Sequence, residues 1–425
     1  MVVGLLLAVV SAGLFFVATA TIWWTLHAWN TPETLRATRF GEADGAHELS
    51  FSLIVPARHE EPVLEHTVLG LLASTHTNFE IIIVVGHDDP DTAAVAYRLA
   101  ERTPTKVRVV VDTHAVKNKP RALNTALPSC RGDVVGVFDA EDQVHPRLLT
   151  HVDHEFRRSG ADVVQGGVQL INFHSSWYSL RNCLEYFFWF RSRLHLHARQ
   201  GFIPLGGNTV FVRSVLLREA GGWDPNCLAE DCDLGVRLSS QGARVVVAYD
   251  PEMVTREETP DTIGSLFRQR TRWNQGFLQV LRKRDWHALP TRQQRLLAWY
   301  TLASPFLLAS VGVVTPFGIV AAIAFKIPIG LAMMTWLPVL PTVAMVAFEV
   351  VGLHDFGVQY RLRVRARHYL TLIAGTPVYH LVLAAAAIRA VWREFTGRND
   401  WELTRHVGAH LPAPARVDRA AEDAA

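Results

Sequence analysis

The sequence predicts an α/β domain with a doubly wound sheet, joined at both ends to helices that cross a membrane. Three observations lead to this prediction. Charged residues are missing from long stretches near both ends of the 425-residue chain, short β-rich runs alternate with helical patterns in its middle, and carboxylates follow several of those runs. The first observation locates the membrane, and the other two locate a domain that binds a ligand.

The charge of the chain is low and balanced. It has 42 Lys and Arg against 40 Asp and Glu, and charged residues make up 19% of it, whereas about 25% is usual for a soluble domain. A disordered chain would carry more charge, and a nucleic-acid binder would show a basic excess. The composition therefore argues against both classes, and we expect no nucleic-acid partner.

Four nearly uncharged segments are predicted to be membrane helices. A helix needs about 20 apolar residues to cross the bilayer core, and the segments are 2–26, 296–325, 327–351 and 369–388. The first is interpreted as a retained signal anchor, because it lacks a basic start and a clear cleavage site. The fourth contains His380 and many Ala residues, so it also fits a helix that lies in the membrane plane.

Basic flanks predict the side of the membrane on which the middle of the chain lies. Residues 261–295 contain eight Lys and Arg and two acids, and residues 360–368 read YRLRVRARH. Lys and Arg concentrate in short cytoplasmic flanks, so residues 30–295 are expected in the cytoplasm of a multi-pass plasma-membrane protein. Three C-terminal spans would then leave the tail outside. If the tail is cytoplasmic, either 296–325 is not a simple span or 369–388 is re-entrant.

Continuous runs of Val and Ile predict strands that are covered on both faces. The runs are 51–56, 81–85, 107–112 and 134–138, and helical patterns lie between them at 63–74, 92–101 and 120–126. A further strand-like run at 209–213 follows Gly206 and Asn208. Strand–helix–strand alternation predicts a doubly wound sheet, whose ligands bind at the carboxyl ends of the strands.

Carboxylates follow one of these strands and open one later helix. Asp139 and Glu141 come directly after the run at 134–138, and oxygen ligands of this kind suit Mg²⁺ or Mn²⁺, although Asp139 can instead cap the next helix. Glu230 and Asp231 open a helix, where a carboxylate can deprotonate a hydroxyl or only stabilise the helix N-terminus. The sequence has no GxGxxG or Walker-type loop, which argues against dinucleotide and P-loop chemistry.

A basic and aromatic motif precedes the second membrane segment. Gln269, Arg272 and Trp273 form Q-x-x-R-W on a predicted interfacial helix. Arg272 offers bidentate contacts to phosphate, and Trp273 offers a flat face to a sugar. A juxtamembrane belt of basic and aromatic residues is the alternative interpretation.

Taken in order, these motifs resemble membrane-embedded family 2 glycosyltransferases of the cellulose-, chitin- and poly-N-acetylglucosamine-synthase branch. The matching segments are Pro56-Ala-Arg-His-Glu60, Asp88-Asp89, Lys119-Pro-Arg-Ala-Leu-Asn124, Asp139-Ala-Glu141, Glu230-Asp231, Gln269–Trp273 and Trp401-Glu-Leu-Thr-Arg-His406. The resemblance is close over residues 50–280. Two motifs depart from the family pattern: D-x-D is D-x-E, which leaves Glu141 or Asp142 as the second metal ligand, and T-E-D is A-E-D.

The resemblance implies a GT-A-type domain that moves a sugar from a nucleotide donor, expected to be UDP-linked, to an acceptor hydroxyl with inversion to a β-linkage. Asp231 would be the general base beside Glu230. Asp139 with Glu141 would hold Mg²⁺ or Mn²⁺, which offsets charge on the departing diphosphate. The donor side is assigned to Pro56, Glu60, Asp88, Lys119, Asp139, Gln269 and Arg272, and the acceptor side to Trp273, Gly206 and Asn208.

The resemblance and the charge pattern together divide the chain into five parts. These are a membrane helix at 1–29, a cytosolic GT-A domain at 30–260, interfacial helices at 261–295, a membrane region at 296–391 and a tail at 392–425. The implied partners are a nucleotide-sugar donor, a glycan or lipid acceptor, membrane lipids and an accessory export protein.

Three functions remain open on the sequence. A processive synthase of a β-linked polysaccharide is preferred because of the Q-x-x-R-W motif. A non-processive enzyme that forms a glycolipid, of the ceramide- or diacylglycerol-glucosyltransferase type, is the alternative, since the spans are few and the chain is small. A scaffold or sugar-nucleotide sensor without turnover is the third, and the intact Asp139, Asp231 and Q-x-x-R-W argue against it.

Overall fold

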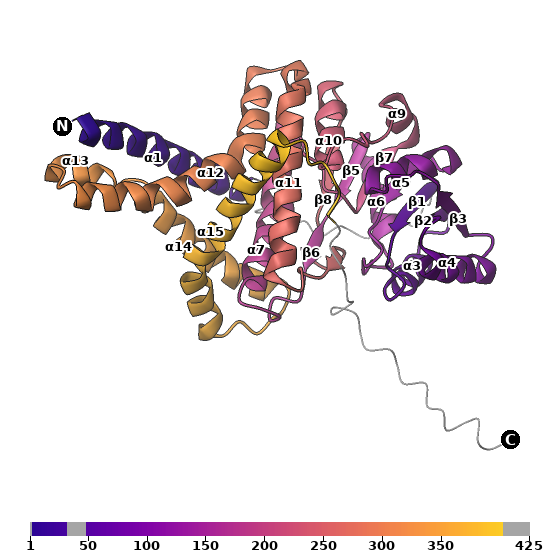
Figure 1. The fold of residues 1–425 in the computed structure, drawn as a ribbon. Coiled ribbons are helices and arrows are strands. Elements are labelled where there is room, and N and C mark those ends of the chain that lie inside the picture. The colour runs from indigo at the N-terminus through magenta and orange to yellow at the C-terminus, as the bar shows by residue number, and fades with distance from the viewer. Residues whose placement is uncertain (1, 32–47, 403–425) are drawn as a thin grey trace.

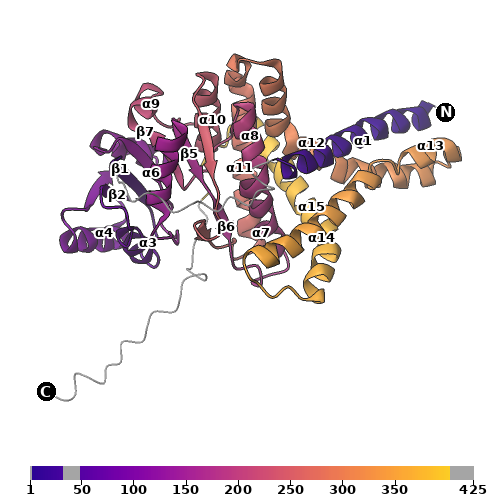
Figure 2. The same cartoon turned by 180° about the vertical axis from the view of Figure 1, so that it is seen from behind.

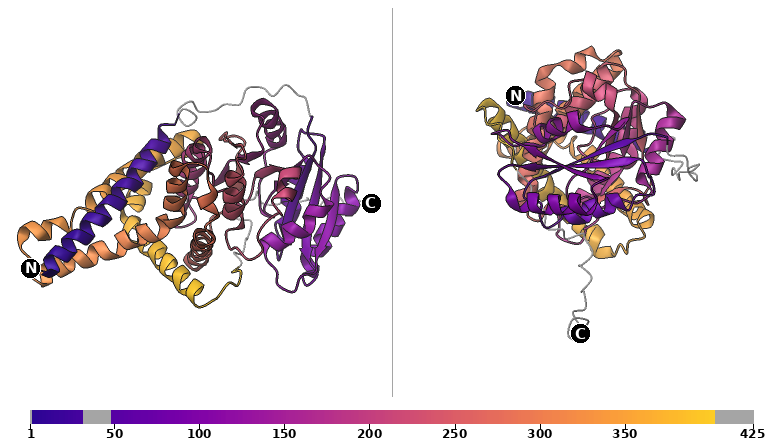
Figure 3. Two further views of the ribbon diagram at one scale, coloured as in Figure 1. Left: turned by 90° about the horizontal axis from the view of Figure 1, so that it is seen from above. Right: turned by 90° about the vertical axis from the view of Figure 1, so that its right-hand side faces the viewer.

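The computed structural model describes residues 2–31 and 48–402, and the sheet and the apolar helices lie at opposite ends of it (Figure 1). Helix α1 (Val2–Trp29) and helix α13 (Ile329–Met334) reach the end that is far from the sheet. Helix α11 (Ile263–Lys283) lies between the two ends, as the view from above also shows (Figure 3). The predicted combination of an α/β domain with flanking apolar helices is confirmed.

The central sheet has seven strands in the order β3-β2-β1-β4-β7-β5-β8. The strands are β1 (Phe51–Ala57), β2 (Phe79–Gly86), β3 (Val107–Asp112), β4 (Val134–Val137), β5 (Val163–Gly166), β7 (Val210–Arg213) and β8 (Val245–Ala248), and β6 (Val168–Leu170) pairs with β9 (Thr255–Glu257) in a second sheet. The first four strands are parallel, and β7 runs antiparallel to β4 and β5. The Val and Ile runs predict β1 to β4 and β7, but not β5, β6, β8 and β9.

Helices cover both faces of the sheet, and this explains why its strands are apolar along their length. Leu53 and Ile81 pack on one face and Ile54 and Ile82 on the other, and all four are fully buried. The helices of this half are α3 (Leu64–Leu72), α4 (Pro90–Arg102), α5 (Lys119–Ala126), α6 (Leu148–Ser159), α7 (Ser179–Phe188), α8 (Leu194–Gln200), α9 (Ser214–Glu219) and α10 (Glu230–Ser240). Figure 2 shows them from behind. Because the first four strands are parallel, their carboxyl ends meet at one edge of the sheet.

Four helices are long and apolar enough to cross a membrane, which confirms the four predicted segments in that sense. They are Val2–Trp29, Arg292–Ala324, Ile329–Gln359 and Ala366–Phe395. In the labels of Figure 1 these are α1, α12 (Arg292–Ala324), α13 followed by α14 (Val339–Gln359), and α15 (Ala366–Phe395). Helix α12 continues through Pro305 and Pro316.

Helix α15 differs from the other three because its start packs against the loop after β6 and its end against α11. Close to its start, His368 packs against Phe173 with ring centroids 5.6 Å apart. At its end, Arg393 donates a hydrogen bond of 2.9 Å to Gln275 of α11. Helix α1 instead reaches the far end, where Gly4 lies against Ile327. The fourth apolar helix therefore packs against the rest of the molecule at both of its ends.

Candidate active site

One large cavity joins the carboxyl edge of the sheet to the apolar helices. Its volume is about 1120 Å³. It begins at the ends of the parallel strands, passes the start of α10, and continues between α1, α12, α14 and α15. The predicted site residues that line it are Pro56, Glu60, Lys119, Asp139, Glu141, Gly206, Asn208, Glu230, Asp231, Gln269, Arg272 and Trp273. The sheet edge thus collects nearly all the residues that the motifs singled out.

A lysine lies among the carboxylates at the centre of the cavity. Lys119, the first residue of α5, forms an ion pair with Asp139 and donates a hydrogen bond of 2.8 Å to the Gly207 carbonyl. Burial would lower the pKa of Lys119, but Asp139, Glu230 and Asp231 outweigh it and raise the pKa well above its usual value. Lys119 is therefore fully protonated. We call Lys119, Asp139, Glu230 and Asp231 the cavity cluster.

The two acids at the start of α10 hold protons more tightly than ordinary carboxyls. Burial and the neighbouring Asp231 raise the pKa of Glu230 to about 8. Burial also raises the pKa of Asp231, against the lowering effect of the Cys232 amide, Lys119 and Arg272. The amide of Cys232 donates to Asp231 Oδ1 over 2.7 Å. At neutral pH Glu230 is then mostly protonated, and a carboxyl tuned upward in a cleft suits general-base work.

Gly207 allows the backbone to come close to this pair of charges. A Cβ atom at position 207 would lie 3.1 Å from Asp231 Oδ2 and 3.5 Å from Lys119 Nζ. A larger side chain would push against both groups. The glycine motif at 206–207, which precedes β7, therefore brings the backbone within reach of the cavity cluster.

Asp142 and Asn208 hold the loop after β4 in place. Asp142 is fully buried and accepts a hydrogen bond of 2.8 Å from the Asp139 amide. Asn208 donates to Asp142 over 3.0 Å and also to Glu257. Burial, followed by the charge of Glu257, raises the pKa of Asp142 well above its usual value. Asp142 thus fixes the backbone at Asp139, which leaves Glu141 as the better placed of the two candidate metal ligands.

At the outer end of the cavity the structure places the predicted acids differently. Asp88 is 41% exposed and pairs with Arg58 over 2.9 Å, and it is Arg58, not Asp88, that reaches the cavity wall. Asp89 caps α4 and accepts from the His59 amide over 2.6 Å. Asp112, at the end of β3, lines the wall instead. The rule that strand ends carry ligand-binding groups would have found Asp112, but none of the motifs includes it.

Helix α11 brings the Q-x-x-R-W residues to the cavity from the membrane side. The side-chain oxygen of Gln269 and Nε of Arg272 are buried and meet no hydrogen-bond partner among the described residues. Arg272 forms no ion pair there either, and its guanidinium lies over the ring of Trp401 at 4.4 Å. Trp273 carries Arg270 on one face at 4.5 Å. Arg272 thus forms no ion pair with a described residue, although its charge lowers the pKa values of Glu230 and Asp231.

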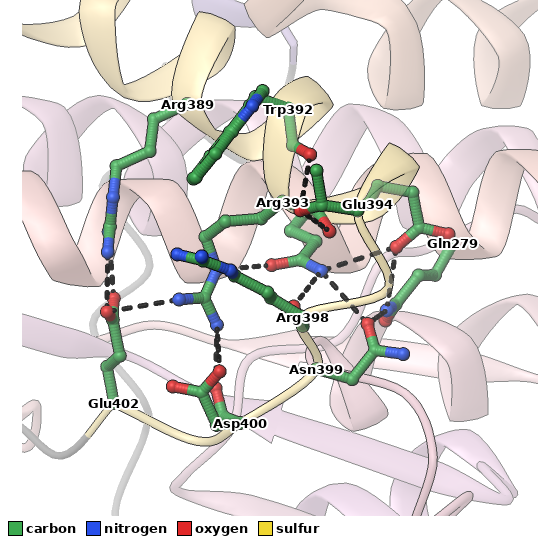
Figure 4. A network of polar contacts seen from close by, with 11 residues as sticks. Gln279, Arg389, Trp392, Arg393, Glu394, Arg398, Asn399, Asp400 and Glu402 are labelled. Carbon is green, nitrogen blue, oxygen red and sulfur yellow. Dashed lines mark hydrogen bonds and ion pairs between the residues drawn. The ribbon is translucent and has the colours of Figure 1, made fainter.

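Trp401 reaches Arg272 because α15 and the segment after it are tied to α11. Figure 4 shows this network. Arg393 bonds Gln275, Asp400 and Glu402, Arg389 pairs with Glu402 over 2.6 Å, and Arg282 pairs with Glu394 over 2.6 Å. We call Arg389, Arg393, Glu394, Asp400 and Glu402 the α15 cluster. Of the predicted tail motif, residues 403–406 lie outside the described residues.

The residues present fit a divalent cation only together with substrate oxygens. Within residues 2–31 and 48–402, no three His, Cys, Asp or Glu side chains come together to hold a metal ion by themselves. Mg²⁺ is commonly bound by one or two carboxylates plus substrate phosphates. Asp139 and Glu141 meet that requirement, because both line the cavity next to Lys119 and face the space that a diphosphate would fill.

The fold and this site define an α/β enzyme with a carboxylate-lined cleft at the parallel strand ends. The sequence comparison then gives the family. Residues 47–276 match the family described as glycosyltransferase like family 2. The chain belongs to this family, and the resemblance found in the motifs is confirmed.

Relatives within the family make different products. A beta-monoglucosyldiacylglycerol synthase of Nostoc sp. is 30% identical over 235 residues, which are 54% of this chain and 49% of that protein. A poly-beta-1,6-N-acetyl-D-glucosamine synthase of Staphylococcus aureus is 25% identical over 255 residues, which are 57% and 58% of the two chains. The match thus spans about half the length of these relatives.

A solved structure shares the fold over almost the whole chain. The mannosyltransferase PcManGT of Pyrobaculum calidifontis, in complex with GDP-Man and Mn²⁺, has a TM-score of 0.63 at 18% identity, covering 92% of this chain and 99% of that one. The likeness extends beyond the matched family region. It therefore includes the apolar helices as well as the sheet.

Proposed function

We propose that this protein transfers a sugar from a nucleotide diphosphate donor to a hydroxyl group of a membrane lipid, with inversion at the anomeric carbon. One observation carries the proposal: the cavity places Asp231 between a polar end at the sheet edge and an apolar end among the membrane helices. A donor that is all polar and an acceptor with apolar chains need these two different ends. The predicted base lies where they would meet.

The proposed transfer uses three residues of the cavity cluster, Asp231, Lys119 and Glu230, together with Arg272. Asp231 accepts the proton of the acceptor hydroxyl as its oxygen bonds to the anomeric carbon and the bond to the diphosphate oxygen breaks. Lys119 and Arg272 bring two positive charges to the negative charge that forms on the diphosphate, which is the electrostatic contribution that transferases depend on. Glu230, protonated at neutral pH because its pKa is about 8, adds no negative charge beside the leaving group.

The donor end is assigned to Glu60, Lys117, Lys119, Asp112 and Arg272, which line the cavity. Asp88 acts only through Arg58. A divalent cation held by Asp139 and Glu141 would supply further positive charge to the diphosphate. PcManGT is in complex with GDP-Man and Mn²⁺, so Mn²⁺ or Mg²⁺ is proposed here. UDP is proposed as the nucleotide from the motif resemblance alone. Chelation should abolish transfer, and added Mn²⁺ or Mg²⁺ should restore it.

The membrane end of the cavity favours a lipid over a polysaccharide. Its walls there are mostly aliphatic or small residues of α12, α14 and α15, including Leu308, Val311, Met345, Leu381 and Ala384. Such a surface suits acyl or prenyl chains, whereas a polymer of sugars needs polar and aromatic partners. A relative from Nostoc sp. is named for a glucosyldiacylglycerol product, which agrees with a lipid acceptor.

A processive polysaccharide synthase is the second candidate. The observation in its favour is that Gln269 and Trp273 lie on the cavity wall beside Asp231, in the motif on which the sequence-based preference rests. The relative from Staphylococcus aureus is named for such a polymer. An accessory export protein would be needed only in this case.

The membrane arrangement follows from the same geometry. We propose that α1, α12 and α14 cross the membrane and that α15 lies at the cytoplasmic interface along α11. Three crossings put the sheet and the C-terminal tail on the same side. A cytoplasmic tail is then consistent with the cytoplasmic position that the basic flanks predict for the sheet. The five-part division of the chain, with boundaries at 29, 260, 295 and 391, is kept as part of this proposal. Cysteine labelling of residues near positions 2 and 398 in intact cells tests it.

Product analysis separates the candidates. The full-length protein, purified in detergent, is incubated with Mn²⁺, a membrane lipid extract and one radiolabelled nucleotide sugar at a time, and its products are resolved by chromatography and mass. A single glycolipid with one added sugar is expected. A ladder of products would favour the polysaccharide synthase, and a label that is never transferred with any donor would overturn the proposed function.

A further inference from the structure

Arg193 is an arginine in the cavity wall that the reaction described above does not use. It is the last residue of a π-helical turn, Trp189–Arg193, that joins α7 to α8. Such turns are rare and often occur at functional sites. The side chain lines the cavity together with Thr21, Thr25 and Tyr300, at the level where α1 and α12 enter the apolar half.

The charge of Arg193 has no counter-ion among the described residues. Its Nη2 donates to the Thr25 hydroxyl over 2.8 Å, and no carboxylate lies within ion-pair distance. Two neighbouring arginines differ: Arg181 pairs with Glu349 and Arg270 with Glu185, at 2.6 and 2.5 Å. Arg193 is only partly exposed, and a cation in such a place gains from an anionic ligand that compensates its charge.

The side chain of Arg193 contacts a hydroxyl, and the two carboxylates that act on its charge from farther away, Glu185 and Glu349, each pair with another arginine. The hydroxyls of Thr21 and Tyr300 lie 2.6 Å apart on the same wall. His197, one helical turn after Arg193, has its pKa lowered to about 3 by burial and by Arg193 itself, so it is neutral. The niche therefore offers one guanidinium and several hydroxyls, a set that suits a phosphoryl group.

The niche is continuous with both other parts of the cavity. On one side the same cavity is lined by Leu228, Glu230 and Asp231. On the other side, Leu308 and Val311 continue the wall among the apolar helices. A molecule bound at Arg193 would thus have its chains between the helices and its polar end toward Asp231.

From this we propose that Arg193 binds the phosphoryl group of an anionic membrane lipid, whose chains follow α1 and α12 and whose free hydroxyl is presented to Asp231. The inference rests on the proposed transfer to a lipid hydroxyl and narrows its acceptor class to lipids that carry both a phosphodiester and a hydroxyl. A neutral lipid such as a diacylglycerol would leave Arg193 without an anion.

Lipid binding tests the inference separately from sugar transfer. The full-length protein with Asp231→Asn is purified in a non-ionic detergent without phosphate, and binding of phosphatidylglycerol, diacylglycerol and inorganic phosphate is measured by native mass spectrometry. Phosphatidylglycerol should bind at least tenfold more tightly than diacylglycerol. Arg193→Gln should remove that preference, Arg193→Lys should keep part of it, and Arg199→Gln, an exposed arginine on α8, should match the parent.

Each other outcome has a defined meaning. Equal binding of the two lipids, or an Arg193→Gln protein that keeps the preference, would overturn the inference. Inorganic phosphate that binds through Arg193 and is not displaced by phosphatidylglycerol would overturn the lipid assignment. If Arg193→Gln does not fold, as judged by gel filtration, the Arg193→Lys and Arg199→Gln proteins still decide. If the unmutated protein transfers sugar from no donor, the proposed function is refuted. The lipid-binding result obtained with Asp231→Asn is unaffected.

Discussion

The cavity cluster and the α15 cluster both contain several buried or half-buried charges, but they differ in how completely those charges are paired. In the α15 cluster each carboxylate meets an arginine: Glu394 meets Arg282, and Asp400 and Glu402 meet Arg393. In the cavity cluster three carboxyl groups surround the single ammonium of Lys119, while Arg272 nearby stacks on Trp401 and forms no ion pair with any residue that the structure describes. Paired charges hold the structure together, and unpaired charges await a ligand.

The difference explains why the pKa values of carboxyl groups move in opposite directions in the two clusters. Hydrogen bonds from Arg389 lower the pKa of Glu402, as expected for a carboxylate with a partner. Burial and a neighbouring acid raise the pKa of Glu230 to about 8, as expected for a carboxylate with too few partners. Shifts of the second kind gather at functional sites, and here they coincide with the predicted motifs.

The largest effect should come from removing the base. Asp231→Asn keeps the size of the side chain but cannot accept the proton, so the transfer rate should fall by about 10³-fold. Asp400→Asn makes the same chemical change in the α15 cluster, at a side chain that is 69% exposed, and should leave the rate within about threefold. The rates are measured with saturating donor in detergent. Equal losses in both variants would mean that the two clusters do not differ in role.

Removing an arginine from the α15 cluster should affect stability instead. Arg393→Ala leaves Gln275, Asp400 and Glu402 short of a partner in a site where the arginine is 5% exposed, and should cost about 3 kcal/mol of stability. Thermal unfolding in detergent measures it. Arg398→Ala, an exposed arginine that stacks on Trp392, is the matched control and should cost under about 1 kcal/mol. A stable Arg393→Ala protein would show that the network does not hold α15 on α11.

The contact between Trp401, which follows the α15 cluster in the chain, and Arg272 of the cavity wall should have a smaller effect. Trp401 lies over Arg272 at 4.4 Å, and a cation–π contact is worth about 0.5–2 kcal/mol. Trp401→Ala should therefore raise the KM for the donor by about three- to tenfold, because Arg272 loses its orientation, with little change in kcat. Trp392→Ala removes an exposed tryptophan of α15 and should leave KM unchanged. A KM that stays the same in both would separate Trp401 from donor binding.

The smallest effect is a change in pH dependence. Glu230 has its pKa raised to about 8, so it is neutral below that pH and charged above it. Ionisation adds a negative charge beside the leaving diphosphate, and the parent rate should fall by several-fold between pH 7 and pH 9. Glu230→Gln mimics the protonated form, so its rate at pH 7 should lie within about threefold of the parent and should not fall toward pH 9. A decline of equal size in the variant would assign it to another group.

The sequence alone determined the fold class, the family and most of the site. Val and Ile runs identify β1 to β4 because strands covered on both faces must be apolar at every position. Parallel strands bring their carboxyl ends to one edge of the sheet, so the sequence predicts that Asp139 lies at that edge. The family motifs supplied Glu230, Asp231 and the Q-x-x-R-W residues, and all of these line the cavity.

Tertiary structure decided what depends on partners that are distant in the sequence. Asn208 was assigned to the acceptor, yet it donates to Asp142 and to Glu257. Of Asp88, Asp89 and Asp112, only Asp112 reaches the cavity wall. Arg193 lies in no motif. Its side chain forms no ion pair with a described residue and donates instead to Thr25, which is 168 positions away. Hydropathy shows that residues 369–388 are apolar, but only the contacts of His368 with Phe173 and of Arg393 with Gln275 show where the two ends of this helix pack. Composition records what a segment contains, whereas packing decides which charges are neutralised and which remain free to bind.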